Sequence, residues 1–174
     1  TTRLGDQRAS ELDFLSEADF AAAKNQARDL GFVHASNDLD LSVVMDAVRG
    51  SGSGTLRRMR WLGVAVSLTD QNDLWTAYST ALLATKTESN QTKRDFRKRA
   101  VSAALNGVLR ARQPGQQVSA LSTLAEALEA VDRGRDMISV LRVAEAIDPR
   151  HDIVTTLDRA VAKYGFRITG STVE

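Results

Sequence analysis

Residues 121–149, LSTLAEALEAVDRGRDMISVLRVAEAIDP, decide the fold of this chain. The first part places apolar side chains on one face of a helix with 3.6 residues per turn. These side chains are Leu121, Leu124, Ala125 and Leu128. A second helix follows, and Pro149 ends it because proline cannot continue a helix. The stretch therefore predicts two antiparallel helices.

This spacing resembles one tetratricopeptide repeat, the helix–turn–helix unit of a helical solenoid. The small residues Ala125 and Ala144 allow the two helices to approach closely, and Leu141 supplies a large apolar side chain. One position departs from the pattern, since Met137 stands where the repeat has alanine. We therefore expect looser packing there and describe the unit as repeat-like. Such units usually bind or space proteins and seldom catalyse.

The rest of the chain shows the same kind of organisation. Caps and apolar stripes predict further helices, around residues 16–31, 38–47, 56–66, 74–82, 96–108 and 152–165. The expected connections are a flexible glycine–serine break at 50–54, a polar loop at 85–93 and a separator at Pro114-Gly115. No strand–helix–strand alternation is present. We predict an all-α, helical-repeat (tetratricopeptide-like) stack of about seven or eight helices.

Residues 1–165 are expected to form a single helical domain. Its first part, residues 1–12, is expected to be a polar arm. Residues 166–174 alternate like the start of a strand and would lead into a following domain. Two of the expected helices have well-defined apolar faces. The helix at 96–108 should bury Phe96, Ala100, Val101, Ala104, Leu105 and Val108, and the last helix Val154, Leu157, Val161 and Tyr164.

Composition limits the class of function. The chain has 174 residues, a formal charge of +1, two prolines and no cysteine. The near balance of charge argues against nucleic acid or an anionic membrane as the main partner. No apolar run approaches the roughly 20 residues that span a bilayer. Without cysteine there is no disulfide, no thiolate nucleophile and no thiol zinc site. Because the chain starts without methionine, we expect a processed product or part of a longer protein.

Several motifs invite a functional interpretation. Gly50, Gly52 and Gly54 precede a helix like a phosphate loop, but the Lys-Ser/Thr pair and the incoming strand are missing, so a linker is favoured. The basic run at 93–99 could bind an acidic partner or phosphates, although a solvated helix face is favoured. Its basic residues are Lys93, Arg94, Arg97, Lys98 and Arg99.

His34 and His151 lie in turns and lack a second histidine at metal-site spacing. Trp61, Trp75 and Tyr78 fall on or beside apolar stripes, so core packing is favoured over an aromatic ligand pocket. No serine-nucleophile or paired-carboxylate signature appears. We therefore predict a protein that is not an enzyme, with no catalytic residue, no cofactor and no metal site.

The C-terminal end carries a resemblance to a known family. Asp148-Pro149, the following helix and then KYGFRITGSTVE at 163–174 are similar to bacterial alpha-2-macroglobulin family proteins, where a helical region ends in a similar Gly-Phe-Arg sequence. Upstream, residues 12–19, 75–83 and 101–106 also resemble that region. The resemblance implies a helical region N-terminal to the first macroglobulin-like β-sandwich domain.

The same resemblance implies a large periplasmic or cell-envelope protein that traps attacking proteases. The family's thioester motif contains cysteine, which this chain lacks, so no functional residue is carried over. The expected function is a non-catalytic spacer or docking domain, and its partners are other domains of the same polypeptide, envelope proteins or proteases. The alternative is a free-standing tetratricopeptide-like adaptor that binds a peptide or protein. An enzyme fragment with a phosphate site at 50–54 is a third, weaker hypothesis.

The extended C-terminal segment generates a first prediction. Val173 has no sheet partner within this sequence, and an isolated edge leaves its amides unpaired. We expect fast amide hydrogen exchange at residues 169–174 in this chain alone and slow exchange in a longer chain that includes the next domain. Strong protection in the short monomeric chain would remove the main support for the macroglobulin resemblance.

Overall fold

The computed structural model describes residues 41–165, and all regular structure in this range is helical. The structure thus confirms an all-α fold for this part of the chain. The predictions made for the arm at 1–12, the helix at 16–31, Asp38 and the segment 166–174 lie outside the described residues. The described helices are α3 Leu41–Arg49, α4 Leu56–Leu68, α5 Asn72–Ala84, α6 Asn90–Arg110, α7 Pro114–Ala130, α8 Gly134–Ile147 and α9 His151–Tyr164.

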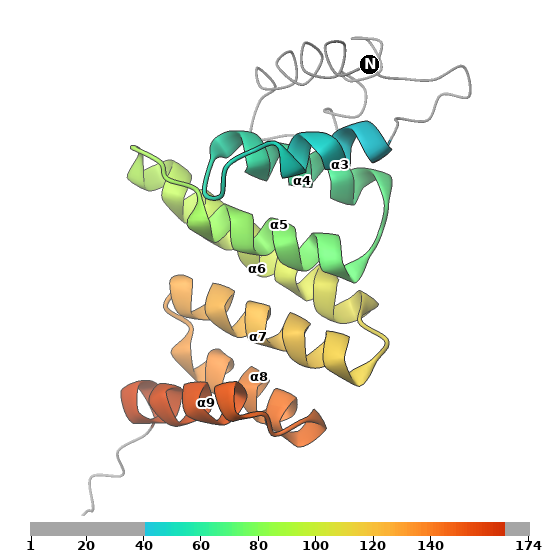
Figure 1. Ribbon diagram of the computed structural model, residues 1–174. Helices are drawn as coiled ribbons and strands as arrows, with labels where there is room; N and C mark the ends of the chain where they lie inside the picture. The colour runs from blue at the N-terminus through green and yellow to red at the C-terminus, as the bar shows by residue number, and fades with distance from the viewer. Residues whose placement is uncertain (1–40, 166–174) are drawn as a thin grey trace, which may run out of the picture.

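The helices stack in chain order (Figure 1). Each helix packs against the next one along the chain, and α5 also packs against α7. One apolar core runs from α3 and α4 through α5 and α6 to α7, α8 and α9. This order of contacts, from α3/α4 at one end to α8/α9 at the other, is what short turns between successive helices produce.

The α7–α8 pair fits the prediction made from residues 121–149. Every apolar position of the pattern is buried, namely Leu121, Leu124, Ala125, Leu128, Met137, Leu141 and Ala144. Met137 is fully buried although the repeat pattern asks for alanine, so the expected loosening at this position is not seen. An unbranched methionine side chain adapts to an irregular gap in a core. Pro149 lies in the turn between α8 and α9.

The preceding pair, α5 and α6, repeats this spacing of inward-facing positions. On α5 the spacing of Leu121, Leu124, Ala125 and Leu128 of α7 recurs at Trp75, Tyr78, Ser79 and Leu82. On α6 the spacing of Met137, Leu141 and Ala144 of α8 recurs at Ala100, Ala104 and Gly107. All seven are buried except Trp75, which is half-buried. Leu82 lies eighteen residues before Ala100, whereas Leu128 lies nine before Met137. The common spacing supports the repeat-like interpretation, which remains a prediction.

Two helices begin earlier than the sequence indicated. α6 begins at Asn90 within the predicted loop, because the hydroxyl oxygen of Ser89 accepts a hydrogen bond from the Thr92 amide at 3.4 Å and caps the helix. α7 begins at Pro114, which is therefore not a separator. Proline suits the first helical position, where its missing N–H would have no partner within the helix.

Two predicted stripes are rotated relative to the observed buried faces. Leu105 of α6 is 46% exposed and Val161 of α9 is 41% exposed, so neither belongs to the core as expected. Ala103 and Gly107 on α6, and Ile153 and Ala160 on α9, are buried. The sequence-based choice favoured the larger side chains. On α6 the small residues Ala103 and Gly107 are buried and Leu105 is turned outward, whereas on α9 the buried face passes through Ile153, Leu157 and Ala160 and leaves Val161 outside.

The end of α9 is fastened to α7 and α8. The ring of Tyr164 lies so close to Gly134 that a Cβ there would come within 2.2 Å of it. The Tyr164 hydroxyl donates to Glu129 at 3.1 Å, and the Lys163 ammonium donates to the same carboxylate oxygen at 3.2 Å. Partial burial raises the pKa of Glu129, but these two hydrogen bonds together with the positive charges of Lys163 and Arg159 hold that pKa below its usual value.

The α7–α8 packing gives a second prediction with a matched control. Leu124→Ala should lower the free energy of unfolding by about 2–5 kcal/mol, since Leu124 is buried and the change removes apolar contacts and leaves a cavity. Leu109→Ala removes the same atoms from a side chain that is 79% exposed and should change it by less than about 0.5 kcal/mol. Urea denaturation measures both, and equal effects would contradict this assignment of the core.

Candidate functional site

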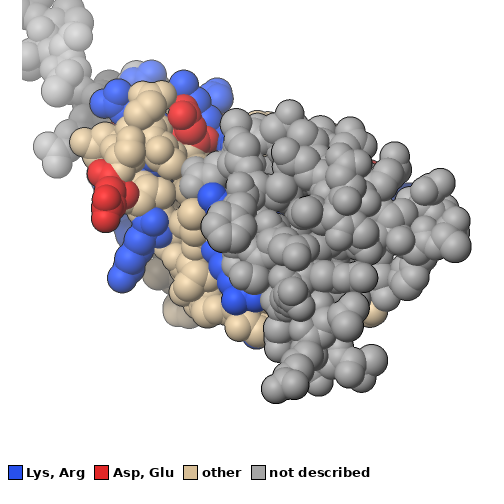
Figure 2. All heavy atoms as spheres, turned by 90° about the horizontal axis from the view of Figure 1, so that it is seen from above, with Lys and Arg blue, Asp and Glu red and all other residues tan. Residues whose placement is uncertain are grey.

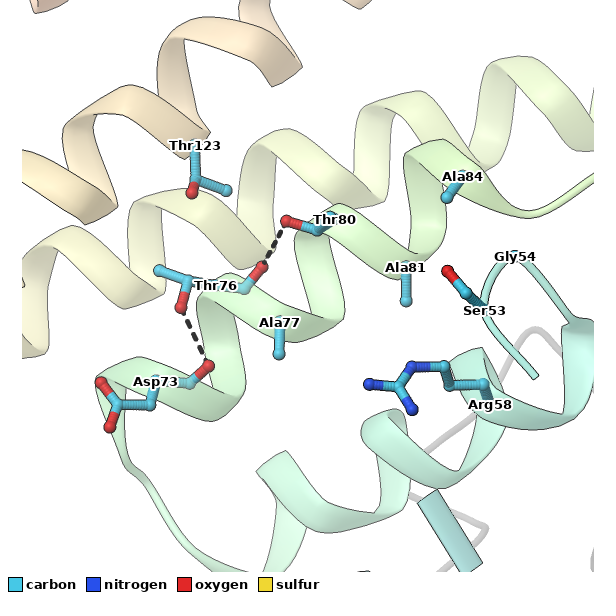
Figure 3. A pocket seen from close by; sticks show the side chains of 10 residues that line it. All are labelled: Ser53, Gly54, Arg58, Asp73, Thr76, Ala77, Thr80, Ala81, Ala84 and Thr123. Atoms are coloured by element: carbon cyan, nitrogen blue, oxygen red, sulfur yellow. Dashed lines mark hydrogen bonds between the residues drawn. The ribbon is translucent and has the colours of Figure 1, made fainter. Parts of the chain in front are cut away.

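A groove of about 350 Å³ runs along the outer face of α5 and is the candidate site (Figure 3). The α3–α4 turn and α4 form one side, and a residue of α7 approaches from the other. The lining residues are Ser53, Gly54, Arg58, Asp73, Thr76, Ala77, Thr80, Ala81, Ala84 and Thr123. Residues from four segments of the chain thus meet at a surface that is not one continuous stretch of sequence.

The floor of the groove is α5, and it carries only small side chains. Between Asp73 and Lys86 the sequence has no charged residue. The hydroxyl of Thr76 donates to the Asp73 carbonyl at 2.9 Å, and that of Thr80 donates to the Thr76 carbonyl at 3.1 Å (Figure 3). Since both hydroxyl protons are used within the helix, these oxygens are left to accept hydrogen bonds from a ligand.

Two opposite charges flank this floor. Arg58 extends from α4 toward Ala81, and Asp73 lies in the first turn of α5, at the other end of the groove (Figure 3). Arg58 is half-buried, and its guanidinium donates one hydrogen bond, of 2.9 Å, to the Val48 carbonyl. Within residues 41–165 neither side chain forms an ion pair with a carboxylate or a cation of the protein.

The glycine-rich segment at 50–54 forms the rim of the groove and is not the flexible break that the sequence indicated. The Ser51 hydroxyl donates to the Ala47 carbonyl at 2.7 Å, and the Thr55 hydroxyl donates to the Gly52 carbonyl at 2.7 Å. Gly54 adopts a φ of +73°, and a Cβ there would meet the Ala84 carbonyl at 3.2 Å. The glycine is needed because the turn is left-handed and tightly packed against α5.

Hydrogen bonds within the chain also hold this turn at the start of α4. The Thr55 hydroxyl oxygen accepts from the Arg58 amide at 3.2 Å, so the start of α4 is already capped by its own side chain. Gly50 and Gly52 serve the turn itself, where the Gly50 and Ser51 amides bond to carbonyls of α3.

The other motifs of the sequence lie away from the groove. The basic run occupies the first turns of α6, where Lys93, Arg94 and Lys98 are exposed and Arg97 and Arg99 are half-buried. His151 is the exposed first residue of α9, and His34 lies outside the described residues. The structure brings none of these together with Arg58 or Asp73 in the groove lining.

The aromatic residues pack as expected rather than lining a ligand pocket. Trp61 is 1% exposed, and burial raises the pKa of Tyr78 well above its usual value. Trp75 is half-buried beside Tyr78, with ring centroids 6.5 Å apart. Its indole N–H donates to Asp70 at 2.9 Å, and Arg110 lies over its ring at 5.5 Å and also pairs with Asp70. These contacts fasten the α4–α5 turn to the end of α6.

Charge is unevenly distributed between the two ends of the stack. Residues 41–112 carry twelve Lys and Arg and five Asp and Glu, whereas residues 113–165 carry six and eight. In the view onto the α3/α4 end, Lys and Arg cover more of the visible described surface than Asp and Glu do (Figure 2). The groove therefore lies in the basic half of the described structure, although the whole chain is nearly neutral.

Between residues 41 and 165, no group of three or more His, Asp or Glu side chains gathers where it could hold a metal ion. None of the helices in this range combines the length and the apolar character that a bilayer crossing requires. Comparison with known protein families, with characterised proteins and with solved structures finds no match to the chain.

Sequence reasoning did not identify the groove residues. Arg58 stands among Arg57 and Arg60, and nothing in the sequence separates the one that faces α5. A signal was present in α5, where the partly exposed positions from Thr76 to Ala84 carry no charge over more than two turns of helix. An outward helix face without charged residues is unusual for a solvated surface, and this could have directed attention to α5.

The rim of the groove gives a third prediction. Gly54→Ala should lower the free energy of unfolding by about 1–2 kcal/mol, because a Cβ is unfavourable at φ +73° and would press on the Ala84 carbonyl. Gly115→Ala is the control, since a Cβ at Gly115 meets nothing within 4 Å. It should leave stability unchanged or raise it by up to about 1 kcal/mol. Thermal and urea unfolding measure both, and a neutral Gly54→Ala would show that the turn is free to rearrange.

Proposed function

We propose that this domain is a non-catalytic docking module that binds a short polypeptide segment in the groove along α5. The observation that carries the proposal is the groove floor, which combines small side chains with free hydroxyl acceptors. Small side chains allow the backbone of a ligand to come close. Acceptor oxygens on Thr76 and Thr80 suit the N–H donors of a peptide backbone.

The dimensions of the groove favour weak and reversible binding. Its volume of about 350 Å³ is near the lower end of the range for ligand sites, about 300–1,000 Å³. We expect dissociation constants on the order of micromolar for an isolated peptide. A second binding site or a covalent connection within one polypeptide would raise the effective affinity.

For the biological setting we propose the helical spacer and docking region of a bacterial alpha-2-macroglobulin-like protease-trapping protein of the periplasm or cell envelope. This part of the proposal rests on the sequence resemblance centred on residues 163–174, of which only Lys163, Tyr164 and Gly165 are described in the structure. In this setting the ligand segment belongs to another domain of the same polypeptide. The alternative, a tetratricopeptide-like adaptor, places the segment on a separate protein, and the groove serves both.

The fourth prediction tests the groove by filling it. Thr80 is exposed and lines the groove, so Thr80→Trp should block it and weaken peptide binding at least about tenfold. Thr155→Trp places the same side chain on an exposed position of α9 and should bind like the unchanged protein. The probe is a library of random heptapeptides displayed on phage, followed by fluorescence polarisation of the selected peptides.

Unchanged melting temperatures must accompany these results, because a misfolded variant loses binding for a trivial reason. Thr123→Trp fills the groove from α7 and serves as a second blocking variant if Thr80→Trp is destabilised. The proposal fails if the library yields no binder, or if selected peptides bind both blocked variants as well as they bind the unchanged protein.

A further inference from the structure

We propose that the segment bound along α5 is extended and carries one acidic and one basic side chain, three or four positions apart. The acidic side chain pairs with Arg58 and the basic one with Asp73. This inference rests on the proposed function and adds the chemistry of the ligand to it. It follows from charges that the structure presents at the two ends of the groove.

Arg58 is the first of the two charges. Its guanidinium carries five N–H donors, and the Val48 carbonyl takes one hydrogen bond from them. That bond holds the half-buried side chain along the wall of the groove, facing Ala81. A planar guanidinium that is held in place loses little freedom on binding and matches a carboxylate with two parallel hydrogen bonds. An acidic side chain of the ligand is the complementary group.

Asp73 is the second charge and lies at the other end of the groove floor. It also favours the start of α5, since a negative charge near the first turn offsets the helix dipole. That role leaves its carboxylate open to a cation from solvent. Lys or Arg of a ligand is complementary, and the same side chain is repelled from the Arg58 end. The two charges therefore also select the direction in which a ligand lies.

The spacing along α5 sets the spacing in the ligand. Asp73 and Ala81, which Arg58 faces, are eight residues apart, or ~12 Å along the axis of an α-helix. An extended chain advances ~3.3 Å per residue, so ~12 Å corresponds to three or four positions. Between the charged side chains, the bound segment lies over Ala77 and Thr80, whose small side chains let its backbone come close, so a ligand side chain that faces the floor must itself be small. Small residues are therefore expected at the intervening positions.

The test is a double-mutant cycle between protein and peptide. Four heptapeptides are compared by fluorescence polarisation, each with alanine and glycine between two variable positions that are four residues apart. The first peptide has Glu and then Lys, and the second has Lys and then Glu. In the third and fourth peptides, glutamine replaces the Glu or the Lys. One charged order should bind more tightly than the other. Arg58→Gln, which keeps a donor for the Val48 carbonyl, should weaken that peptide about two- to fivefold, and Asp73→Asn by a similar factor.

The diagnostic result is the loss of each effect when the partner charge is absent. The peptide with glutamine in place of Glu should bind Arg58→Gln and the unchanged protein with equal affinity. The peptide with glutamine in place of Lys should bind Asp73→Asn and the unchanged protein with equal affinity. Arg142→Gln on α8 and Asp158→Asn on α9 neutralise exposed charges elsewhere and should change nothing. Equal melting temperatures confirm that the variants are folded.

Failure of this inference is distinguishable from failure of the proposed function. If library peptides bind and Thr80→Trp blocks them, but binders lack the charge pair and the two neutral variants bind normally, the groove is a docking site and the charge rule is wrong. If no library peptide binds at the groove, both are wrong. A cycle in which Arg58→Gln weakens all four peptides equally also overturns the pairing, because it shows a general effect on the groove.

Discussion

The close approach of α5 and α6 is the constraint on which the rest of the structure depends. Ser79 is fully buried between them and donates its hydroxyl to the Ala100 carbonyl at 2.7 Å, so the side chain of one helix bonds to the backbone of the other. Gly107 leaves room for the Thr76 methyl group, which a Cβ at Gly107 would meet at 2.9 Å. These contacts fix the rotation of α5 about its own axis. That rotation decides which residues of α5 remain outside to form the groove floor.

The part of the fold that the sequence predicted is the part that depends on local periodicity. The buried positions of α7 and α8 follow from side chains three and four residues apart, and the core confirms them from Leu121 to Ala144. The buried faces of α6 and α9 were harder to predict. On α6 the small residues Ala103 and Gly107 are buried, and on α9 the buried face passes through Ile153 and Ala160. Apolar size was then a poor guide, and Leu105 and Val161 were wrongly assigned to the core.

The candidate site could not be predicted from local sequence patterns, because it consists of residues that the packing of the helices leaves uncovered. Arg58 has the same type and nearly the same position as Arg57 and Arg60, and only the placement of α4 against α5 distinguishes it. The turn at 50–54 was judged by composition, which indicated flexibility. Its structure depends on contacts with the Val48 and Ala84 carbonyls, which no inspection of glycine and serine content reveals.

The packing of Tyr164 on Gly134 has a mechanical consequence. A pull on the chain beyond Gly165 acts first on the ring wedged against Gly134 and on the hydrogen bonds from Lys163 and Tyr164 to Glu129. Glu129 belongs to α7, the helix that also contributes Thr123 to the groove. Tension at this end of the domain is therefore transmitted into the helix that flanks the binding surface. The hydrogen bonds at Glu129 are the contacts through which the force passes into α7.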